Sequence, residues 1–219
     1  MIDMKPYILL NSAMTVDGKI ATECGQLKIS GKEDWMRVHR LRYEFDAIMV
    51  GINTILIDNP RLTIHKIDAD FKDNPIRIVI DSKARTPSDA RVLNDDSDTI
   101  IIVSDMASDE DIQRLTSKAE VIVCGKNRVD LKKAMSILYD RGIESILQEG
   151  GSTLNFAMLE EQLIDKISIC IGSKILGGSR SKTLVDGHGF AEDDCVRLEL
   201  ENFYQLDKDI ILEYDVKYN

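Results

Sequence analysis

Short apolar runs rich in β-branched residues recur along the first two thirds of the chain and alternate with amphipathic segments. The runs are continuous in hydrophobicity, which is typical of parallel strands covered on both faces. The pattern predicts strands that begin near Tyr7, Ala47, Ile76, Thr99, Ala119 and Ser145. Strands that alternate with helices predict an α/β fold with crossover connections.

Two of the intervening segments have helical periodicity. In the segment from Glu33 to Phe45, one face of the predicted helix carries Trp35, Val38, Leu41, Arg42 and Phe45. The segment from Asp130 to Gly142 places on one face Leu131, Ala134, Met135 and Leu138. Gly142 is the residue type that commonly ends a helix. The spacing turns Arg42 toward the buried side, where a charge needs a partner.

The character of the chain changes after Asp165. The run DKISICIGSKILGG and the closing segments CVRLELENFYQL and DIILEYDVKYN read as strands, and LDKD is a predicted hairpin turn. The loop DGHGFAEDD predicts a solvated turn. We therefore expect one domain over residues 1–219, with a mostly parallel central sheet, helices on both faces and a C-terminal antiparallel hairpin.

Composition narrows the function classes. The 219 residues are 43% hydrophobic, enough for a full core, and the formal net charge of −10 argues against a nucleic-acid or anionic-membrane binder. A small phosphorylated ligand needs only a few local cations. The four cysteines are scattered and predict no metal site and no disulfide framework. Without a signal peptide or membrane span, we expect a cytoplasmic protein.

Gly150 and Gly151 follow a predicted strand and precede a predicted helix that begins near Ser152 or Thr153. Bare backbone lets a phosphate approach, and the free N–H groups of a helix N-terminus donate to it. The ordinary interpretation is a tight turn with a Ser or Thr helix cap.

Segment 50–63 repeats this arrangement, with Gly51 at a strand end and Thr54 in a helical first turn. Thr54 could donate to a phosphate or a ribose, and Asp58 could accept from a hydroxyl or an amide. The ordinary alternatives are that Thr54 caps a helix and that Asp58 starts a turn. Open α/β sheets bind ligands at such strand ends. A third strand end carries Ser82, Lys83 and Arg85, which suit the 2′-phosphate of NADP, although an exposed basic turn is common.

The usual nucleotide and hydrolase fingerprints are absent. There is no GxGxxG, because GHGFAE lacks the third glycine, and GGSRSKT lacks the second glycine of a P-loop. No GxSxG marks a nucleophilic serine.

The ordered motifs NSAMTVDGKIAT, VHRLRYEFDAIMVGINTILIDNPRLT, IRIVIDS, QEGGSTLN and LIDKISICIGSKILGG resemble the pyrimidine reductases of riboflavin biosynthesis. The resemblance covers about Tyr7 to Gly178 by motif and the rest by strand pattern. It implies a dihydrofolate reductase-like three-layer fold and a homodimer. No HxE…PCxxC deaminase signature is present, so the chain is similar to the stand-alone archaeal branch of the family.

The reaction is implied by the family resemblance and not by the hydrophobic periodicity of the sequence. It implies that NADPH, with NADH as the alternative, reduces the ribosyl group of 2,5-diamino-6-ribosylamino-4(3H)-pyrimidinone 5′-phosphate to a ribityl chain. A reductase of the deaminated pyrimidine, a dihydrofolate reductase and a non-catalytic NADPH-binding regulator are the alternatives.

The family pattern also implies residue roles. Positions that match its cofactor contacts are Ala13, Thr54, Asp58 and Ser82, with Gly151, Ser152 and Thr153 at the pyrophosphate. Gly150, Lys83 and Arg85 are cofactor candidates from their strand-end positions alone. Positions that match its substrate contacts are Arg42, Leu62, His65 and Glu149, with Arg42 or His65 at the 5′-phosphate. Glu149 and Asp17 are the candidates for handling a proton. Two departures are Leu27, where the family often has a serine, and Ser173, where it has a proline.

Overall fold

The computed structural model describes residues 4–23, 25 and 27–218, so Cys24 lies outside the described chain. The described chain divides into two compact units, each built from separate stretches of sequence. Unit 1 contains the described residues up to Tyr7 and His39–Leu147, and unit 2 contains Ile8–Val38 and the described residues from Gln148 onward. No helix among the described residues is long and apolar enough to cross a membrane.

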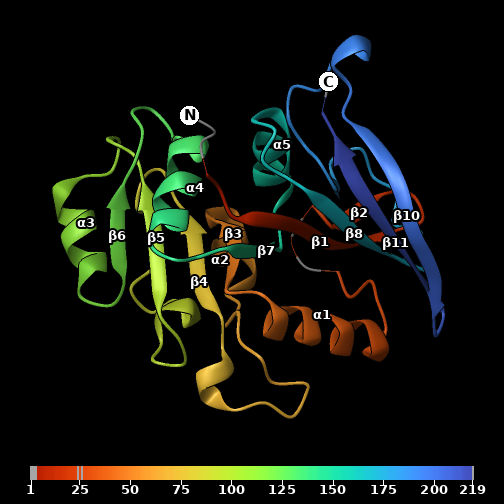
Figure 1. Ribbon diagram of the computed structural model, residues 1–219, viewed down its shortest axis with the longest axis horizontal. Coiled ribbons are helices and arrows are strands. Elements are labelled where there is room, and N and C mark those ends of the chain that lie inside the picture. The colour runs from red at the N-terminus through yellow and green to blue at the C-terminus, as the bar shows by residue number, and fades with distance from the viewer. Residues whose placement is uncertain (1–3, 24, 26, 219) are drawn as a thin grey trace. The chain divides into compact units, whose positions relative to one another are not determined.

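Unit 1 is built on a parallel sheet (Figure 1). Its strands lie in the order β7 (Ser145–Gln148, in this unit up to Leu147), β3 (Ala47–Gly51), β4 (Ile76–Ile80), β5 (Thr99–Val103) and β6 (Glu120–Val123). The register pairs Gly51 with Ile80 and Val103 with Val123, so the carboxyl ends of neighbouring strands lie at one edge. Strands β3, β4 and β5 are almost wholly buried, as their continuous hydrophobicity predicts.

The helices of unit 1 are α2 (Ile52–Asp58), α3 (Asp109–Thr116) and α4 (Leu131–Asp140). Helices α2 and α3 contribute Ile55 and Leu115 to one buried cluster. Helix α4 buries the four predicted residues, begins at an Asp130 cap and is followed by Gly142 at φ 82°. The predicted face and stop of this helix are confirmed.

Helix α1 (Lys32–Glu44) departs from the predicted face. Trp35 is 43% exposed, whereas Asp34, His39 and Arg42 are buried. The prediction of a buried Trp35 is wrong, whereas Val38, Leu41 and Phe45 are partly buried. Because the most buried side chains of this helix are polar, hydropathy alone does not mark its buried side. The prediction that Arg42 turns inward is confirmed.

Unit 2 holds the strands β10 (Arg197–Leu206), β11 (Asp209–Lys217), β8 (Lys166–Gly172) and β1 (Tyr7–Thr15, in this unit from Ile8), in that order. Strands β1 and β8 are parallel, and β11 is antiparallel to both of its neighbours. The predicted hairpin turn lies at Asp207 and Lys208. Together the two units have the predicted fold class, an α/β fold with a mostly parallel sheet and antiparallel C-terminal strands.

The remaining elements of unit 2 are α5 (Ser152–Glu160) and the short paired strands β2 (Lys19–Ala21) and β9 (Lys182–Thr183). The glycine-rich loop that follows β9 is exposed at its glycines, as predicted, but its aromatic side chains are not simply solvated. His188 and Phe190 pack on the buried ring of Phe156, with ring centroids 4.7 and 4.9 Å away. The loop therefore lies along α5.

A buried polar network fixes the start of α1 to the sheet of unit 2. The Arg37 guanidinium donates to Asp34 at 2.8 Å, to Ser168 Oγ at 2.9 Å and to Asn11 Oδ1 at 2.8 Å. The Asp34 side chain is only 3% exposed. All the donors and acceptors of this network come from α1, β1 and β8, so it specifies one seating of the helix.

Replacing Arg37 by Met would leave the Asp34 carboxylate buried without its cation. We expect the free energy of unfolding to fall by about 3 kcal/mol. Urea denaturation measures this fall. Arg40→Met, at an exposed position of the same helix, is the matched control and should cost no more than about 0.5 kcal/mol. Equal losses in the two variants would contradict a special role for the network.

Candidate ligand-binding site

The turn between β7 and α5 has the geometry of an anion site. Gly151 is the N-cap of α5 and provides no side-chain cap, so the alternative of a Ser or Thr cap is wrong. Gly150 has φ 97°, and a Cβ placed on it would meet no atom within 4 Å. Open space, bare backbone and the first N–H groups of a nine-residue helix fit the diphosphate of a dinucleotide.

The hydroxyl of Ser152 already has a partner in unit 2. It donates to the Asp186 carboxylate, and the Asp186 N–H donates to the Ser152 carbonyl at 3.3 Å. Burial acts to raise the pKa of Asp186, but hydrogen bonds from Thr183 and Ser152 hold it below its usual range. Ser152 can therefore offer a phosphate its backbone N–H, whereas Thr153 is exposed.

The approach to this turn is fixed by two buried amides that sequence reasoning missed. Gln148, the last residue of β7, donates to Asn155 Oδ1 at 2.8 Å, and Asn155 donates to the Leu184 carbonyl at 2.8 Å. Both side chains are fully buried. They link the strand end, the first turns of α5 and the loop after β9, and so hold Glu149, Gly150 and Gly151 between fixed ends.

In unit 1, Gly51 ends β3 and is the N-cap of α2, again with no side-chain cap. Thr54 lies in the first turn as predicted, and its interpretation as a helix cap is wrong. Asp58 is the last residue of α2, before Asn59 in the left-handed region. Thr54 therefore lies next to the end of β3 as predicted, and Asp58 lies at the other end of α2, while the cofactor contacts of both stay a prediction.

The turn after β4 is organised by Asp81, a residue that sequence reasoning passed over. Its fully buried carboxylate accepts from the N–H and the hydroxyl of Thr86, each at 2.8 Å. Arg85 Nε lies 3.9 Å from the other Asp81 oxygen. The turn presents Lys83 and Arg85 as exposed residues, while Ser82 accepts a hydrogen bond from the Val129 N–H at 3.1 Å.

A second cluster in unit 1 joins α1 to the loop that follows α2. Arg42, 6% exposed, donates to the Thr63 carbonyl at 2.8 Å, and His65 Nδ1 lies 3.2 Å from the same oxygen. The His39 and His65 rings meet edge to face, with centroids 4.3 Å apart. The structure therefore brings together the predicted phosphate residues Arg42 and His65, and adds His39.

Leu62, a predicted substrate residue in the same loop, has its side chain in the hydrophobic core at 2% exposure. Its backbone has φ 55°. Any contact of Leu62 with a ligand must therefore be made by its backbone, because the side chain is committed to the core.

Cations and burial keep both imidazoles of this cluster neutral. Burial, with Arg42, His65 and Lys66, lowers the pKa of His39 to about 3. Burial, with Arg42, Lys66 and Arg61, also lowers the pKa of His65. Since the same cations act on both rings, they converge on one place, which favours an anionic ligand there.

Asp17 is held by hydrogen bonds that stabilise its charged form. Its carboxylate accepts from Thr15 Oγ1 at 2.6 Å and from the N–H groups of Leu176 and Gly177 at 3.0 and 2.6 Å. These hydrogen bonds lower its pKa to about 2. Asp17 anchors the loop after β8, because three donors hold it as a carboxylate. Its predicted part in handling a proton stays a prediction.

The structure places the other predicted residues without testing their roles. Glu149 follows β7 and is partly buried, and Ala13 lies in β1 opposite Cys170 of β8. Ser173, which replaces the family's proline, donates to the Lys208 carbonyl in the hairpin turn. Among the described residues, no group of three or more His, Cys, Asp or Glu side chains is placed to hold a metal ion.

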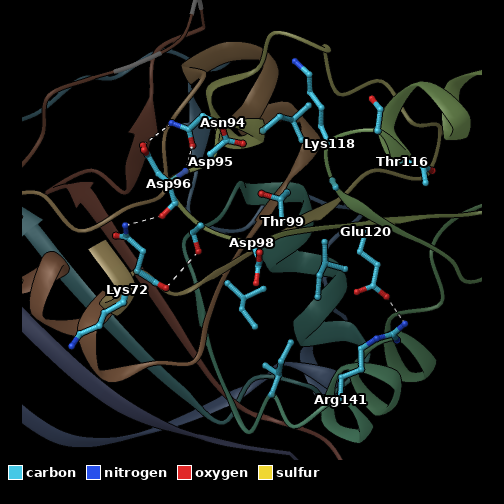
Figure 2. Close-up of a pocket in the computed structure, with 18 residues that line it drawn as sticks. Lys72, Asn94, Asp95, Asp96, Asp98, Thr99, Thr116, Lys118, Glu120 and Arg141 are labelled. Carbon is cyan, nitrogen blue, oxygen red and sulfur yellow. Dashed lines mark hydrogen bonds and ion pairs between the residues drawn. The ribbon is translucent and has the colours of Figure 1, made fainter. Parts of the chain in front are cut away.

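A hollow of about 1230 Å³ lies at the opposite edge of the unit 1 sheet, where β4, β5 and β6 begin (Figure 2). Its lining mixes both charges, with Asp95, Asp96, Asp98, Lys118 and Arg141. None of the predicted site residues lines it. Beside it, the buried Arg77 holds the lining loop by donating to Asn94 Oδ1 at 2.6 Å and to the Ser97 carbonyl. The hollow is thus separate from the strand ends that carry the candidate site.

Comparison with known proteins shows the family. The model of the RibD C-terminal domain matches residues 6–212. The chain is 54% identical over 215 residues to the 2,5-diamino-6-ribosylamino-4(3H)-pyrimidinone 5′-phosphate reductase of Methanothermobacter thermautotrophicus, covering 98% of this chain and 100% of that relative. An Archaeoglobus fulgidus protein of the same name is 43% identical and covers 85% of this chain and 89% of its own.

The comparison with solved structures gives a similar result. RibD of Acinetobacter baumannii superposes with a TM-score of 0.81 at 25% identity, over 97% of this chain and 58% of that one. The likeness therefore extends over nearly all of the chain in three dimensions as well as in sequence.

Because Asp17 has a pKa below that of a free carboxyl, its stabilising contribution is present above about pH 4 and is lost as the pH falls through about 2. We expect Asp17→Asn to speed hydrogen exchange at the Leu176 and Gly177 amides at all pH values from about 4 to 8. NMR-detected exchange measures this. The Lys174 amide, which donates to the Gly172 carbonyl at 2.7 Å, is the internal control. Unchanged protection of Leu176 and Gly177 would contradict the anchoring role.

Proposed function

The chain belongs to the RibD C-terminal domain family, and we propose that it is the riboflavin-pathway reductase of 2,5-diamino-6-ribosylamino-4(3H)-pyrimidinone 5′-phosphate. The observation that carries the proposal is 54% identity over the full length of a relative with that name. Each unit carries groups that suit it chemically: unit 2 has a helix N-terminus that suits a diphosphate, and unit 1 has a cluster of cations that suits a phosphate.

When bound, a reduced nicotinamide cofactor supplies the hydride that converts the ribosyl group to a ribityl chain. We propose NADPH as this cofactor. Lys83 and Arg85 support the choice, since exposed cations at a strand end suit a 2′-phosphate. The pairing of Arg85 with Asp81 at 3.9 Å leaves Lys83 as the less compensated charge of this turn.

The chain's own groups bind and orient the cofactor and the substrate. We propose that the backbone of Gly150 and Gly151 and the first N–H groups of α5 hold the diphosphate, with Thr153 adding a hydroxyl. Thr54, Asp58, Ser82 and Ala13 keep the cofactor roles that the family resemblance implies. On the substrate, Arg42 and His65 serve the 5′-phosphate, and Leu62 contributes backbone alone.

Glu149 is the carboxylate that we propose to hold the substrate and to manage any proton at the sugar. It lies one residue after the buried end of β7 and directly before the two glycines, so its backbone is fixed on both sides. Asp17 is the second candidate for this proton, although its low pKa disfavours proton donation near neutral pH.

We also propose that the protein is a homodimer, as the family resemblance implies. In support, β10 is the last strand in its sheet and exposes Leu198, Leu200 and Phe203, the last at 67%. Apolar side chains gathered on an edge strand are typical of an interaction surface.

The direct test of the function is NADPH oxidation by the purified protein. We expect turnover with the diaminopyrimidinone ribosyl phosphate, and little with its deaminated counterpart or with dihydrofolate. Absorbance of the reduced nicotinamide follows the reaction, and NADH in place of NADPH tests the cofactor preference. Faster turnover of the deaminated compound would reassign the substrate, and cofactor binding without any turnover would indicate a regulator.

We expect Gly151→Val to abolish NADPH binding and to leave the protein folded. Gly151 has φ −79°, which any residue adopts, so the added side chain obstructs the ligand rather than the backbone. Fluorescence titration with NADPH and circular dichroism measure the two effects. Thr153→Val is the matched control: it keeps every backbone N–H and should weaken binding by about tenfold at most. Unchanged NADPH affinity in Gly151→Val would refute the diphosphate assignment.

A further inference from the structure

The turn of residues 82–86, which follows β4 in unit 1, is held by two charged side chains. The Asp81 carboxylate accepts from the Thr86 N–H and hydroxyl through Oδ2, each at 2.8 Å. Arg114 of α3 donates to the Ala84 carbonyl at 2.7 Å and to the Thr86 carbonyl at 2.8 Å. Ala84 is fully buried and has φ 51°. Groups from the end of β4 and from α3 therefore set the shape of this turn.

The second oxygen of the Asp81 carboxylate is incompletely satisfied. Oδ1 is buried and accepts no hydrogen bond from the described residues. Arg85 Nε lies 3.9 Å from it, which is beyond hydrogen-bond distance. Because a buried carboxylate oxygen without a donor is costly, the pair gains if Nε moves closer. With Nε directed at Asp81, the half-exposed guanidinium of Arg85 keeps Nη1 and Nη2 for another acceptor.

Lys83, the other cation of the turn, is less compensated in charge but also less directed. It is exposed, and no hydrogen bond or ion pair with another described residue holds its ammonium. An ammonium on a flexible stem supplies charge without a fixed geometry, and salt screens it where it is exposed. The two cations of the turn are therefore unequal, and Arg85 is the one whose direction the fold sets.

A carboxylate beside an arginine has a particular meaning for cofactor choice. NADPH and NADH differ only at the 2′ position of the adenosine ribose. A carboxylate at a strand end suits the 2′-hydroxyl of NADH, from which it can accept, and repels the 2′-phosphate of NADPH. A guanidinium beside that carboxylate reverses the preference, because its two Nη groups can donate to one phosphate. Asp81 and Arg85 together thus have the chemistry that favours the phosphate.

We propose that Arg85 selects NADPH by donating both Nη groups to the 2′-phosphate, with Asp81 and Arg114 as its positioning residues. The inference rests on the proposed function for the identity of the cofactor. Asp81 holds Nε and so directs the Nη groups away from itself. Arg114 holds the Ala84 and Thr86 carbonyls, on either side of Arg85 in the chain, and so fixes its backbone. Neither positioning residue needs to touch the cofactor.

The test is the ratio of the dissociation constants of NADH and NADPH, because this ratio isolates the 2′-phosphate. Fluorescence titration of the purified protein measures both constants, and we expect a clear preference for NADPH. Arg85→Met should lower that preference by about tenfold. Arg85→Lys keeps the charge but loses both Nε and the paired Nη groups, so it should recover little of the preference. Lys83→Met is the matched control in the same turn and should lower the preference by about twofold.

A second pair of variants separates positioning from charge. Arg114→Met removes the donors to the Ala84 and Thr86 carbonyls and should lower the NADPH preference by about fivefold, because Arg85 is then less preorganised. Lys118→Met is its control. Lys118 donates to the Ser88 carbonyl at 2.9 Å, outside the turn, so this variant removes one cation and leaves the turn held. Its preference should equal that of the unaltered protein. Circular dichroism shows whether each variant is folded.

Equal affinities for NADPH and NADH in the unaltered protein would overturn the proposal. So would a full NADPH preference in Arg85→Lys, because charge alone would then suffice, or equal losses in Arg114→Met and Lys118→Met. If the variants follow the expected order in a protein that reduces no pyrimidine, the inference stands and the proposed function fails. Pyrimidine reduction by a protein that binds both cofactors alike would do the reverse.

Discussion

Parallel strand pairing is the constraint on which the site in unit 1 depends. With β3, β4, β5 and β6 in parallel register, their carboxyl ends lie along one edge, and whatever follows each strand is placed there. Gly51 and Ser82 thus become neighbours of one sheet edge although thirty residues of sequence separate them. The other edge receives the mixed-charge hollow around Asp96 and Arg141, held by Arg77. Direction of pairing therefore decides which loops are available for a ligand.

Buried polar groups then fix the helix and the turns that strand pairing alone does not position. Within unit 2, Arg37 binds the start of α1 to β8, and within unit 1, Arg42 donates to the Thr63 carbonyl. Asp81 shapes the basic turn after β4, and Gln148 with Asn155 fixes the strand end before Glu149. Each group is costly to bury without partners, so each specifies a single arrangement of the residues around it. The candidate ligand groups are thereby held in place before any ligand arrives.

Unit 2 uses some of its candidate ligand groups for its own structure. Ser152 gives its hydroxyl to Asp186, and Asp17 gives its carboxylate to the loop at Leu176. In unit 2 the groups left for a ligand are mostly backbone N–H groups, at Gly150, Gly151 and the start of α5. Unit 1 by itself offers the cations and imidazoles near Thr63. Backbone N–H groups suit a cofactor diphosphate that is common to many enzymes, whereas the charged side chains suit the particular phosphate of a substrate.

The sequence by itself determined the long strands, the α/β class, the C-terminal hairpin and the strand-to-helix turns at Gly51 and Gly151, because hydrophobic period and glycine position are local properties. It also marked Arg42 as an inward-facing charge, and the family motifs marked His65. Tertiary structure alone decided that Trp35 is exposed, that Asp17 anchors a loop, that Leu62 is core and that His39 supports His65. These outcomes depend on which groups distant in sequence supply hydrogen bonds, burial and charge, and no local pattern records those partners.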